Sequence, residues 1–448
     1  MEKKTEVMAS PNVARAVLKL AGPAIISLVV LAIYNMADTY FVSLASETDL
    51  EVAAVSVYMP ILLVTMAVSV LFASGGGALL SRQLGEGDLK GAGETASSTV
   101  VLAFISGLIV CACIPWAQPL LLAVGASSDT IDMAWQYAVI MFAASPVQLT
   151  NMAFNNLLRA EGNAVRSMTG MVTGALLNIA LDPVLISAAG MGVMGAAVAT
   201  AASQVVSFVI LGSAYWRGRT VVPIRLRGFH FQRDTVAYIL RVGLSTFLIQ
   251  IFTGIGFAVV NIYAKPYGDG TIAAIGIVNR LQYLGFAVVF GFAQGYQPVC
   301  GFNFGAGRYD LLRRTLYFGF AAAVAIGAAL TGFFRLTGRW LIEQFASQAA
   351  VIETGVETLG WFTVAYPLTA FTLIIMMTCQ SLGQAAEAIL VACGRQGFCM
   401  IPLLMILSQT LGFQGILISP LLSDIASGLI SLYLAVRIFH VLRRRQTA

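Results

Sequence analysis

The stretch Phe72-Ala73-Ser74-Gly75 reappears, 220 residues later, as Phe292-Ala293-Gln294-Gly295. The same offset carries Leu84-Gly85-Glu86-Gly87 onto Phe304-Gly305-Ala306-Gly307. Because the offset barely drifts along the chain, the two halves are predicted to contain the same elements in the same order. Internal repetition of this kind decides the architecture before any single element is assigned.

Composition assigns the chain to the membrane class. Of its 448 residues, 58% are hydrophobic and only 10% are charged, and the mean hydropathy is +0.84. A soluble domain carries about 25% charged residues, so this chain has too much apolar surface for one aqueous core. A duplicated membrane bundle is typical of secondary transporters, in which the substrate binds between two repeats that move against each other.

Apolar stretches that cross a bilayer as helices need about 20 residues. Twelve are predicted, six in each half: 16–44, 52–79, 95–117, 131–158, 165–188, 193–215, 236–264, 271–300, 315–335, 354–379, 388–408 and 412–438. The predicted fold is therefore an all-α integral membrane protein with two six-helix lobes, residues 1–215 and 235–448. The stretch 216–234, which is rich in arginine, is predicted to form the linker between the lobes.

Lysine and arginine gather on one side of this predicted bundle. They lie at the N-terminus, after spans 2, 4 and 8, in the linker, after span 10 at Arg395, and at 443–445. The opposite loops are poor in basic residues, so the positive-inside rule places both termini in the cytoplasm. Since each half has an even number of spans, the halves are parallel repeats. We expect a multi-pass protein of a bacterial-type inner membrane, with the lipid bilayer and not nucleic acid as its partner.

The sequence argues against catalysis. Gly85–Gly87 and Gly305–Gly307 are predicted to be tight turns and not phosphate loops, because neither carries the Lys-Ser/Thr of a P-loop. No nucleophile–base pair or metal-ligand set is visible, and the histidines, His230 and His440, lie at the predicted cytoplasmic edge. We therefore expect neither an enzyme nor a bound organic cofactor.

Ionisable residues inside the predicted spans are few, and such residues are functional candidates because burial in hydrocarbon is costly. Asp38 lies in span 1, Asp182 in span 5, Asp424 in span 12 and Arg280 in span 8. For Asp424, structural and functional roles are equally open. Arg280 is interpreted as a structural counter-ion within the second half or as a side chain that reaches outward.

Asp182 has polar neighbours. Asn178 precedes it by four residues, so the two side chains share one helix face, and Pro183 weakens the helix directly after them. Thr200 adds a hydroxyl from span 6. The second half has no copy of Asp38, Asn178 or Asp182 at the repeat offset. This asymmetry favours a functional role over the alternative, a structural hydrogen-bond cluster.

Polar and polarizable side chains in spans 7, 8 and 10 indicate a substrate cavity. Methionine repacks around varied ligands, and aromatic rings contact cations. Together with a tyrosine of span 1, the predicted lining residues are Tyr34, Gln250, Tyr263, Asn279, Gln282, Met376 and Met377. For each of these residues the alternative is ordinary packing in the core or against lipid.

Three stretches resemble the multidrug and toxic compound extrusion (MATE) transporters: Tyr34–Thr39, Leu158–Asn163, and Asn178–Pro183 followed by Gly192–Thr200. The resemblance covers the whole chain. It implies a V-shaped pair of lobes that exports cationic or amphipathic compounds in exchange for H⁺ or Na⁺.

The resemblance also implies a coupling-cation site at Asp38, Asn178, Asp182 and Thr200, with any Na⁺ held by Asp38 and Asp182. Some members carry further acids in spans 7 and 10. This chain has none from Arg241 to Gly268 or from Thr358 to Ala386, so coupling is expected in the first lobe.

The expected function is therefore secondary antiport of drug-like small molecules by a monomer, with H⁺ or Na⁺ as the coupling ion and no cofactor. One alternative is a lipid-linked oligosaccharide flippase of a related fold, which should line its groove with many cations. A channel is a further alternative that the duplication does not exclude.

Overall fold

The computed structural model describes residues 6–45, 50–224 and 231–447. Within this part, the side chains of residues 35, 37–45, 50, 52, 269 and 444–447 are not described. Nearly all of the described chain is helical. The long helices of the first half are α2 (Val13–Ala45), α3 (Leu50–Glu86), α4 (Leu89–Ala112), α6 (Ile131–Ala160), α7 (Ala164–Asp182) and α8 (Gly192–Trp216), with short α5 (Ala117–Ala123) between α4 and α6.

The second half repeats this order. Its helices are α9 (Arg233–Ala264), α10 (Asp269–Gly305), α11 (Tyr309–Glu343), α12 (Ala349–Val364), α13 (Tyr366–Ser381), α14 (Ala385–Cys393), α15 (Met400–Leu411) and α16 (Phe413–Thr447). Two π-helical segments interrupt the spans: η2 (Pro183–Ala188) continues α7, and η4 (Gly394–Cys399) joins α14 to α15.

Twelve spans are present in the described part when one bent pair counts as a single span. Eleven helices or joined helices are long and apolar enough to cross a membrane. The twelfth is α12 with α13, which meet at an angle of 42°. Pro367 lies in the first turn of α13, where the missing N–H interrupts the helical hydrogen bonds. The predicted all-α membrane fold is confirmed.

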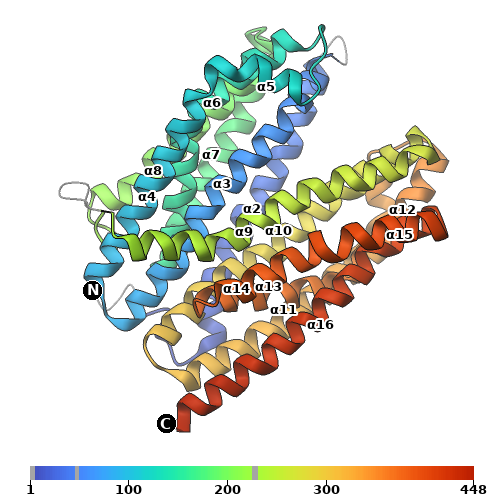
Figure 1. Ribbon diagram of the computed structural model, residues 1–448. Coiled ribbons are helices and arrows are strands. Elements are labelled where there is room, and N and C mark those ends of the chain that lie inside the picture. Colours follow the sequence, from blue (N-terminus) through green and yellow to red (C-terminus); the bar gives the residue numbers. More distant parts are fainter. Residues whose placement is uncertain (1–5, 46–49, 225–230, 448) are drawn as a thin grey trace.

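The helices form two lobes arranged as a V (Figure 1). Helices α2–α8, blue to green, make one lobe, and α9–α16, yellow-green to red, make the other. The lobes lie together at the end of the molecule that carries both termini, which we call the terminal end, and they diverge at the opposite end. The first-lobe helices α2 and α3 pack along the second-lobe helices α10 and α9, respectively.

Glycines allow the closest approach of the lobes. A Cβ on Gly75 of α3 would lie 2.0 Å from the carbonyl oxygen of Ile239 in α9, and one on Gly243 would lie 1.8 Å from that of Leu71. Such contacts exclude any side chain, because backbone atoms fill the space. The two helices can therefore cross at this distance only because both positions are glycine.

The sequence repeat is also a packing repeat. Gly107 of α4 lies against Pro146 of α6, so that a Cβ added to this glycine would lie 2.4 Å from the proline Cα. In the second lobe Gly327 of α11 lies against Pro367 in the same way, at 2.7 Å. The offsets that relate these residues, 220 and 221, are those of the sequence repeat.

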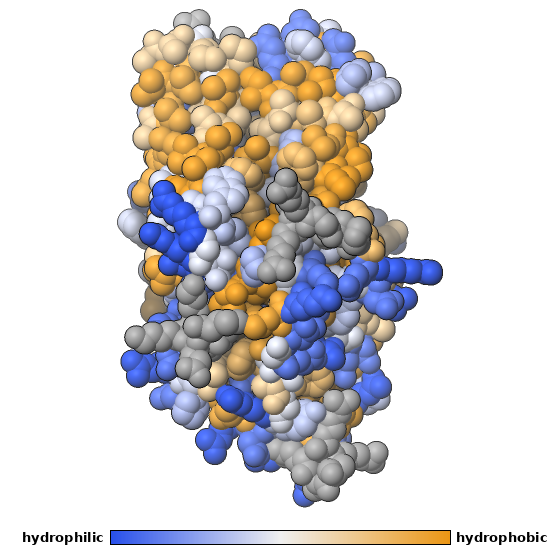
Figure 2. Space-filling model, turned by 90° about the vertical axis from the view of Figure 1, so that its left-hand side faces the viewer, coloured by the Kyte–Doolittle hydropathy of each residue, from blue (hydrophilic) through white to orange (hydrophobic). Residues whose placement is uncertain are grey.

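Large apolar side chains are exposed over much of the outer surface. Ile109, Trp116 and Leu336 are more than half exposed. Figure 2 shows hydrophobic residues over the upper half of one face and hydrophilic residues gathered in the lower half. A surface of this kind matches a lipid core bordered by a polar interface. The main apolar core lies at the terminal end and joins both lobes, with Leu157, Phe292 and Ile374 among its buried members.

Candidate functional site

A cavity of about 190 Å³ lies between the lobes. Side chains from α2, α3, α6, α7 and α8 form its first-lobe wall, and side chains from α9 and α10 form its second-lobe wall. The second-lobe wall is mostly apolar and aromatic, with Tyr283, Phe286 and Phe290. We call this space the central cavity.

The first-lobe wall of the central cavity is polar. The Asn151 side chain donates to the Gln204 side-chain oxygen at 2.7 Å, and the Ser207 hydroxyl donates to Asn151 at 3.3 Å. Thr200, Ser203, Gln204 and Ser207 all face the cavity from α8. The last three lie three, four and seven residues after Thr200, which places all four on one face of the helix. This polar stripe in an apolar span is the sequence signal for the part of the wall that α8 forms.

Asp182 lies directly behind this wall. Its side chain is fully buried, whereas Asn178 and Thr200, both nearly buried, line the cavity. A carboxylate can only accept from an amide, so the nitrogen of the Asn178 amide faces Asp182. In that orientation it donates to Oδ2 of Asp182 at 3.1 Å, and the amide oxygen accepts from the Thr200 hydroxyl at 3.2 Å. The structure thus brings together three of the four residues predicted for the cation site.

The local sequence explains why polar backbone lies beside the buried carboxylate of Asp182. Helix α7 ends at Asp182, and Pro183 opens the π-helical segment. Because proline has no N–H, it cannot bond the carbonyl of Ile179 in the usual helical pattern. The break therefore leaves polar backbone near Asp182 inside a membrane span, where irregular backbone is tolerated only next to protein or a cavity.

Asp38 belongs to α2, but its side chain lies outside the described part, so its predicted place in the site stays a prediction. Tyr34, one helical turn earlier, lines the central cavity.

The other predicted cavity residues divide among several places. Gln250 lines the central cavity, and Met376 lines a second cavity of about 20 Å³ that shares Ile249 and Phe286 with it. Asn279 and Gln282 line a third cavity of about 60 Å³ inside the second lobe. Met377 lines a small space of about 10 Å³ towards the terminal end. Tyr263 packs against a small apolar cluster around Val260 and Leu404.

Arg395 lies inside a span, as the predicted limits 388–408 imply, and not in the basic loop after span 10 with which the count of basic residues grouped it. It lies in η4, within the span Ala385–Leu411, and its Nε contacts Oδ1 of Asp424 at 2.5 Å. Thr369 donates to the other carboxylate oxygen of Asp424 at 3.1 Å. The stretch Gly394-Arg395-Gln396-Gly397 is polar and rich in glycine, but the chain continues through it as a π-helix. Arg280 is exposed on α10, in line with the outward-reaching alternative.

A glutamine lies at the centre of the buried contact between the lobes. The amide nitrogen of Gln380 donates to the hydroxyls of Ser245 at 2.7 Å and Thr246 at 2.8 Å. Its oxygen accepts from Gln297 at 2.7 Å and from Ser74 of the first lobe at 3.3 Å. We call these five residues the glutamine hub. Nothing in the sequence pattern singled it out, because its members come from four helices.

The lobes close tightly at the terminal end. Gly85 of α3 and Gly305 of α10 face each other's helices: a Cβ added to each would lie 2.1 Å from the Phe302 oxygen and 2.0 Å from the Arg82 oxygen, respectively. Phe302 and Arg82 are themselves repeat equivalents. Gly85 and Gly305 themselves are still helical. The predicted turns form two residues further along the chain, at Gly87 and Gly307, where φ is +78° and +67°.

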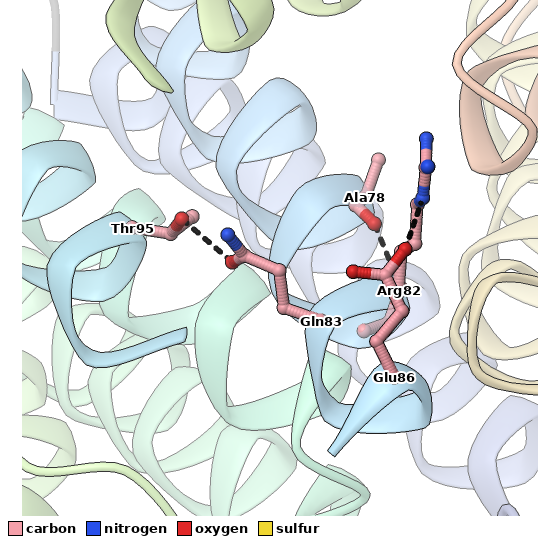
Figure 3. Close-up of polar contacts among 6 residues, drawn as sticks. Ala78, Arg82, Gln83, Glu86 and Thr95 are labelled. Carbon is pink, nitrogen blue, oxygen red and sulfur yellow. Dashed lines mark hydrogen bonds and ion pairs between the residues drawn. The ribbon is translucent and has the colours of Figure 1, made fainter. Parts of the chain in front are cut away.

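Polar contacts hold the end of α3 beside this crossing (Figure 3). The Nε of Arg82 contacts Oε1 of Glu86 at 2.8 Å, and its guanidinium lies 5.3 Å from the ring centre of Phe304 in α10. Thr95 of α4 donates to the Gln83 side chain at 2.7 Å. These contacts fix the helix end against both lobes.

Comparison with known proteins gives a consistent result. The MatE family model matches residues 23–184 and 246–406, once in each half. The multidrug export protein MepA of Staphylococcus aureus (strain NCTC 8325 / PS 47) is 26% identical over 438 residues, which cover 97% of this chain and 95% of MepA. MepA of Staphylococcus haemolyticus is 25% identical over 437 residues, with the same coverage.

Solved structures agree over the full length. A multidrug resistance MATE family transporter of the MOP superfamily, in its outward-facing conformation, superposes with a TM-score of 0.93 at 27% identity, covering 99% of both chains. A MOP superfamily transporter from Pyrococcus furiosus, whose binding pocket is described as having reverse polarity, gives 0.91 at 28% identity, covering 98% of this chain and 99% of that one.

Proposed function

Because the chain belongs to the MatE family of transporters, we propose that it is an antiporter that exports cationic or amphipathic organic compounds in exchange for H⁺ or Na⁺. The observation that carries the proposal is the fully buried carboxylate of Asp182 behind two cavity-lining residues, Asn178 and Thr200. The multidrug export activity in the name of the MepA relatives supports the cargo class.

The geometry suggests how an ion and a cargo would compete. A proton or Na⁺ bound at Asp182 would weaken the hydrogen bond that the Asn178 amide donates to this carboxylate, because a protonated or metal-bound carboxyl group is a poorer acceptor. Asn178 and Thr200 form part of the cavity wall, so their reorientation alters the surface that a cargo contacts. Asp38 is proposed as the second carboxylate of this unit. Two carboxylates that share one site would titrate as a coupled pair.

The driving force is sufficient for uphill export. An ion that moves inward supplies about 2.3 kcal/mol per charge per 100 mV of membrane potential. If the ion is H⁺, each unit of pH difference adds about 1.4 kcal/mol. At one H⁺ per cargo molecule, a difference of one pH unit alone supports a tenfold ratio between the outside and inside concentrations of a neutral cargo.

The basic residues set the proposed orientation, with the terminal end in the cytoplasm. The V-shaped pair of lobes then opens to the outside, and the crossing of Gly85 and Gly305 closes the inner side. The flippase alternative is not favoured, because the described lining of the central cavity contains no lysine or arginine.

Reconstituted liposomes test the proposal. With an imposed Na⁺ gradient in one set and an imposed pH gradient in another, at least one should drive accumulation of a fluorescent cationic cargo. The Asp182→Asn variant should lose this accumulation, while Asp234→Asn, an exposed acid at the start of α9, should retain it. Gradient-independent equilibration would instead indicate a channel, and full activity of Asp182→Asn would remove the proposed coupling residue.

A further inference from the structure

The second lobe contains an arginine, Arg395, with only one side-chain N–H group in contact with its acidic partner. Arg395 lies ten residues from Ala385, the first residue of its span, which is about 15 Å of helix and so about half of a bilayer core. Its side chain is 25% exposed, although it sits within a membrane span. Burying an arginine at this depth costs free energy unless its N–H groups find hydrogen-bond acceptors. Its neighbours therefore indicate what role the arginine has.

Asp424 holds this arginine in place. Its Oδ1 contacts Nε of Arg395, and its Oδ2 accepts from Thr369. The hydroxyl of Ser423 also donates to the backbone oxygen of Arg395. With both carboxylate oxygens engaged, Asp424 is poorly suited to bind a coupling cation and acts as a positioning residue for the guanidinium.

Only the Nε of Arg395 is engaged by Asp424. Among the described residues neither of its terminal nitrogens has a hydrogen-bond partner, and Arg395 lines both the 20 Å³ and the 60 Å³ cavities. The larger of these is also lined by Asn279, Gln282 and Gln396, and by Asp424, whose two carboxylate oxygens are engaged by Arg395 and Thr369. Arginine has five N–H donors, and Asp424 takes one, so the cavity is rich in donors arranged around a planar fork.

The 20 Å³ cavity adjoins both of the others and is lined by Phe286 as well as by Arg395. The 20 Å³ cavity shares Ile249 and Phe286 with the central cavity, and it shares Arg395 and Gln396 with the 60 Å³ cavity. A cargo whose aromatic, cationic part lies against Phe286 could therefore direct one substituent towards Arg395.

We propose that Arg395, positioned by Asp424, forms a subsite for an acidic substituent, such as a carboxylate, on aromatic zwitterionic cargo. The proposal rests on the proposed export function and adds a cargo class to it. The guanidinium accepts a carboxylate through its two terminal nitrogens, and Asn279, Gln282 and Gln396 supply further amide donors. Cations without an acid group bind in the central cavity alone.

Two rhodamines provide a matched pair of probes. Rhodamine 110 carries a free carboxylate, and rhodamine 123 is its methyl ester and a cation. Binding to the purified protein, measured by fluorescence anisotropy, should be tighter for the acid, and Arg395→Gln should weaken acid binding about tenfold relative to the ester. Arg280→Gln, an exposed arginine on α10, is the matched control and should leave the acid-to-ester ratio unchanged.

The Arg395→Gln change leaves Asp424 buried without its partner and can impair folding. The double variant Arg395→Gln/Asp424→Asn removes both charges and should show the same loss of preference. An unchanged acid-to-ester ratio in the folded double variant overturns the subsite, and so does an equal loss of both probes. If wild-type protein prefers the acid in binding but exports neither probe from liposomes, the proposed function fails while the subsite stands.

Discussion

The glycine crossing at the terminal end makes a quantitative prediction about conformational balance. In Gly305→Ala, the new methyl group would begin 2.0 Å from the Arg82 oxygen and 2.9 Å from its carbonyl carbon. A carbon and an oxygen approach to about 3.3 Å at closest, so α3 and α10 must separate locally by about 1.3 Å. Neither neighbour is a flexible side-chain end, so the backbone itself must move.

Overpacking of this size costs about 1–3 kcal/mol. Because the contact exists only while the terminal end is closed, the cost falls on this conformation and not on one that is open there. The closed-to-open ratio should therefore drop by about 5–150-fold. A state populated at about 3% would rise to between about 13% and about 80%.

The measurement is the distance between spin labels at Lys90→Cys and Arg313→Cys, both exposed near the terminal end on opposite lobes, in a cysteine-free background. Gly305→Ala should add or enlarge a population at longer distance. The control is Gly276→Ala on the same helix, where a Cβ meets nothing within 4 Å. Identical distance distributions in Gly305→Ala and the parent, or equal changes in both variants, would refute the reasoning.

Three further predictions concern the cation site, the cavity wall and the glutamine hub. Asp38→Asn and Asp182→Asn should each abolish ion-driven export from a folded protein, and the double variant should be no worse than either, because each change breaks a shared unit; multiplicative losses in cell-based drug resistance would contradict this. Gln250→Ala should alter the relative export rates of different cargos without abolishing ion-driven turnover, and loss of every cargo at normal expression would count against its place in the cavity wall. Gln380→Leu should lower the thermal midpoint in detergent, since each buried partner left unsatisfied costs about 1–3 kcal/mol, whereas Gln414→Leu at an exposed contact should have little effect. Equal midpoints in these two variants would mean that the glutamine hub contributes little.

Much of the fold could be predicted because the repeat and the apolar spans are carried by local sequence. The grouping of Asn178, Asp182 and Thr200 also followed, from helical spacing within span 5 and from the family resemblance. The pairing of Arg395 with Asp424 could not be predicted, because it joins residues 29 positions apart through a π-helical segment whose composition is typical of a loop. The glutamine hub could not be predicted either, because its members show no regular spacing in the sequence and come together only in the folded protein.

The two π-helical segments have a consequence for how the sequence can change. Each α-helical residue turns the chain by about 100°, so losing one residue from an ordinary span rotates everything beyond it away from its neighbours. A π-turn holds one extra residue, and a deletion within Pro183–Ala188 or Gly394–Cys399 would convert it to a regular turn while the flanking faces keep their register. These are therefore the places in the described spans where single-residue deletions should be tolerated, and where length differences among related chains should accumulate.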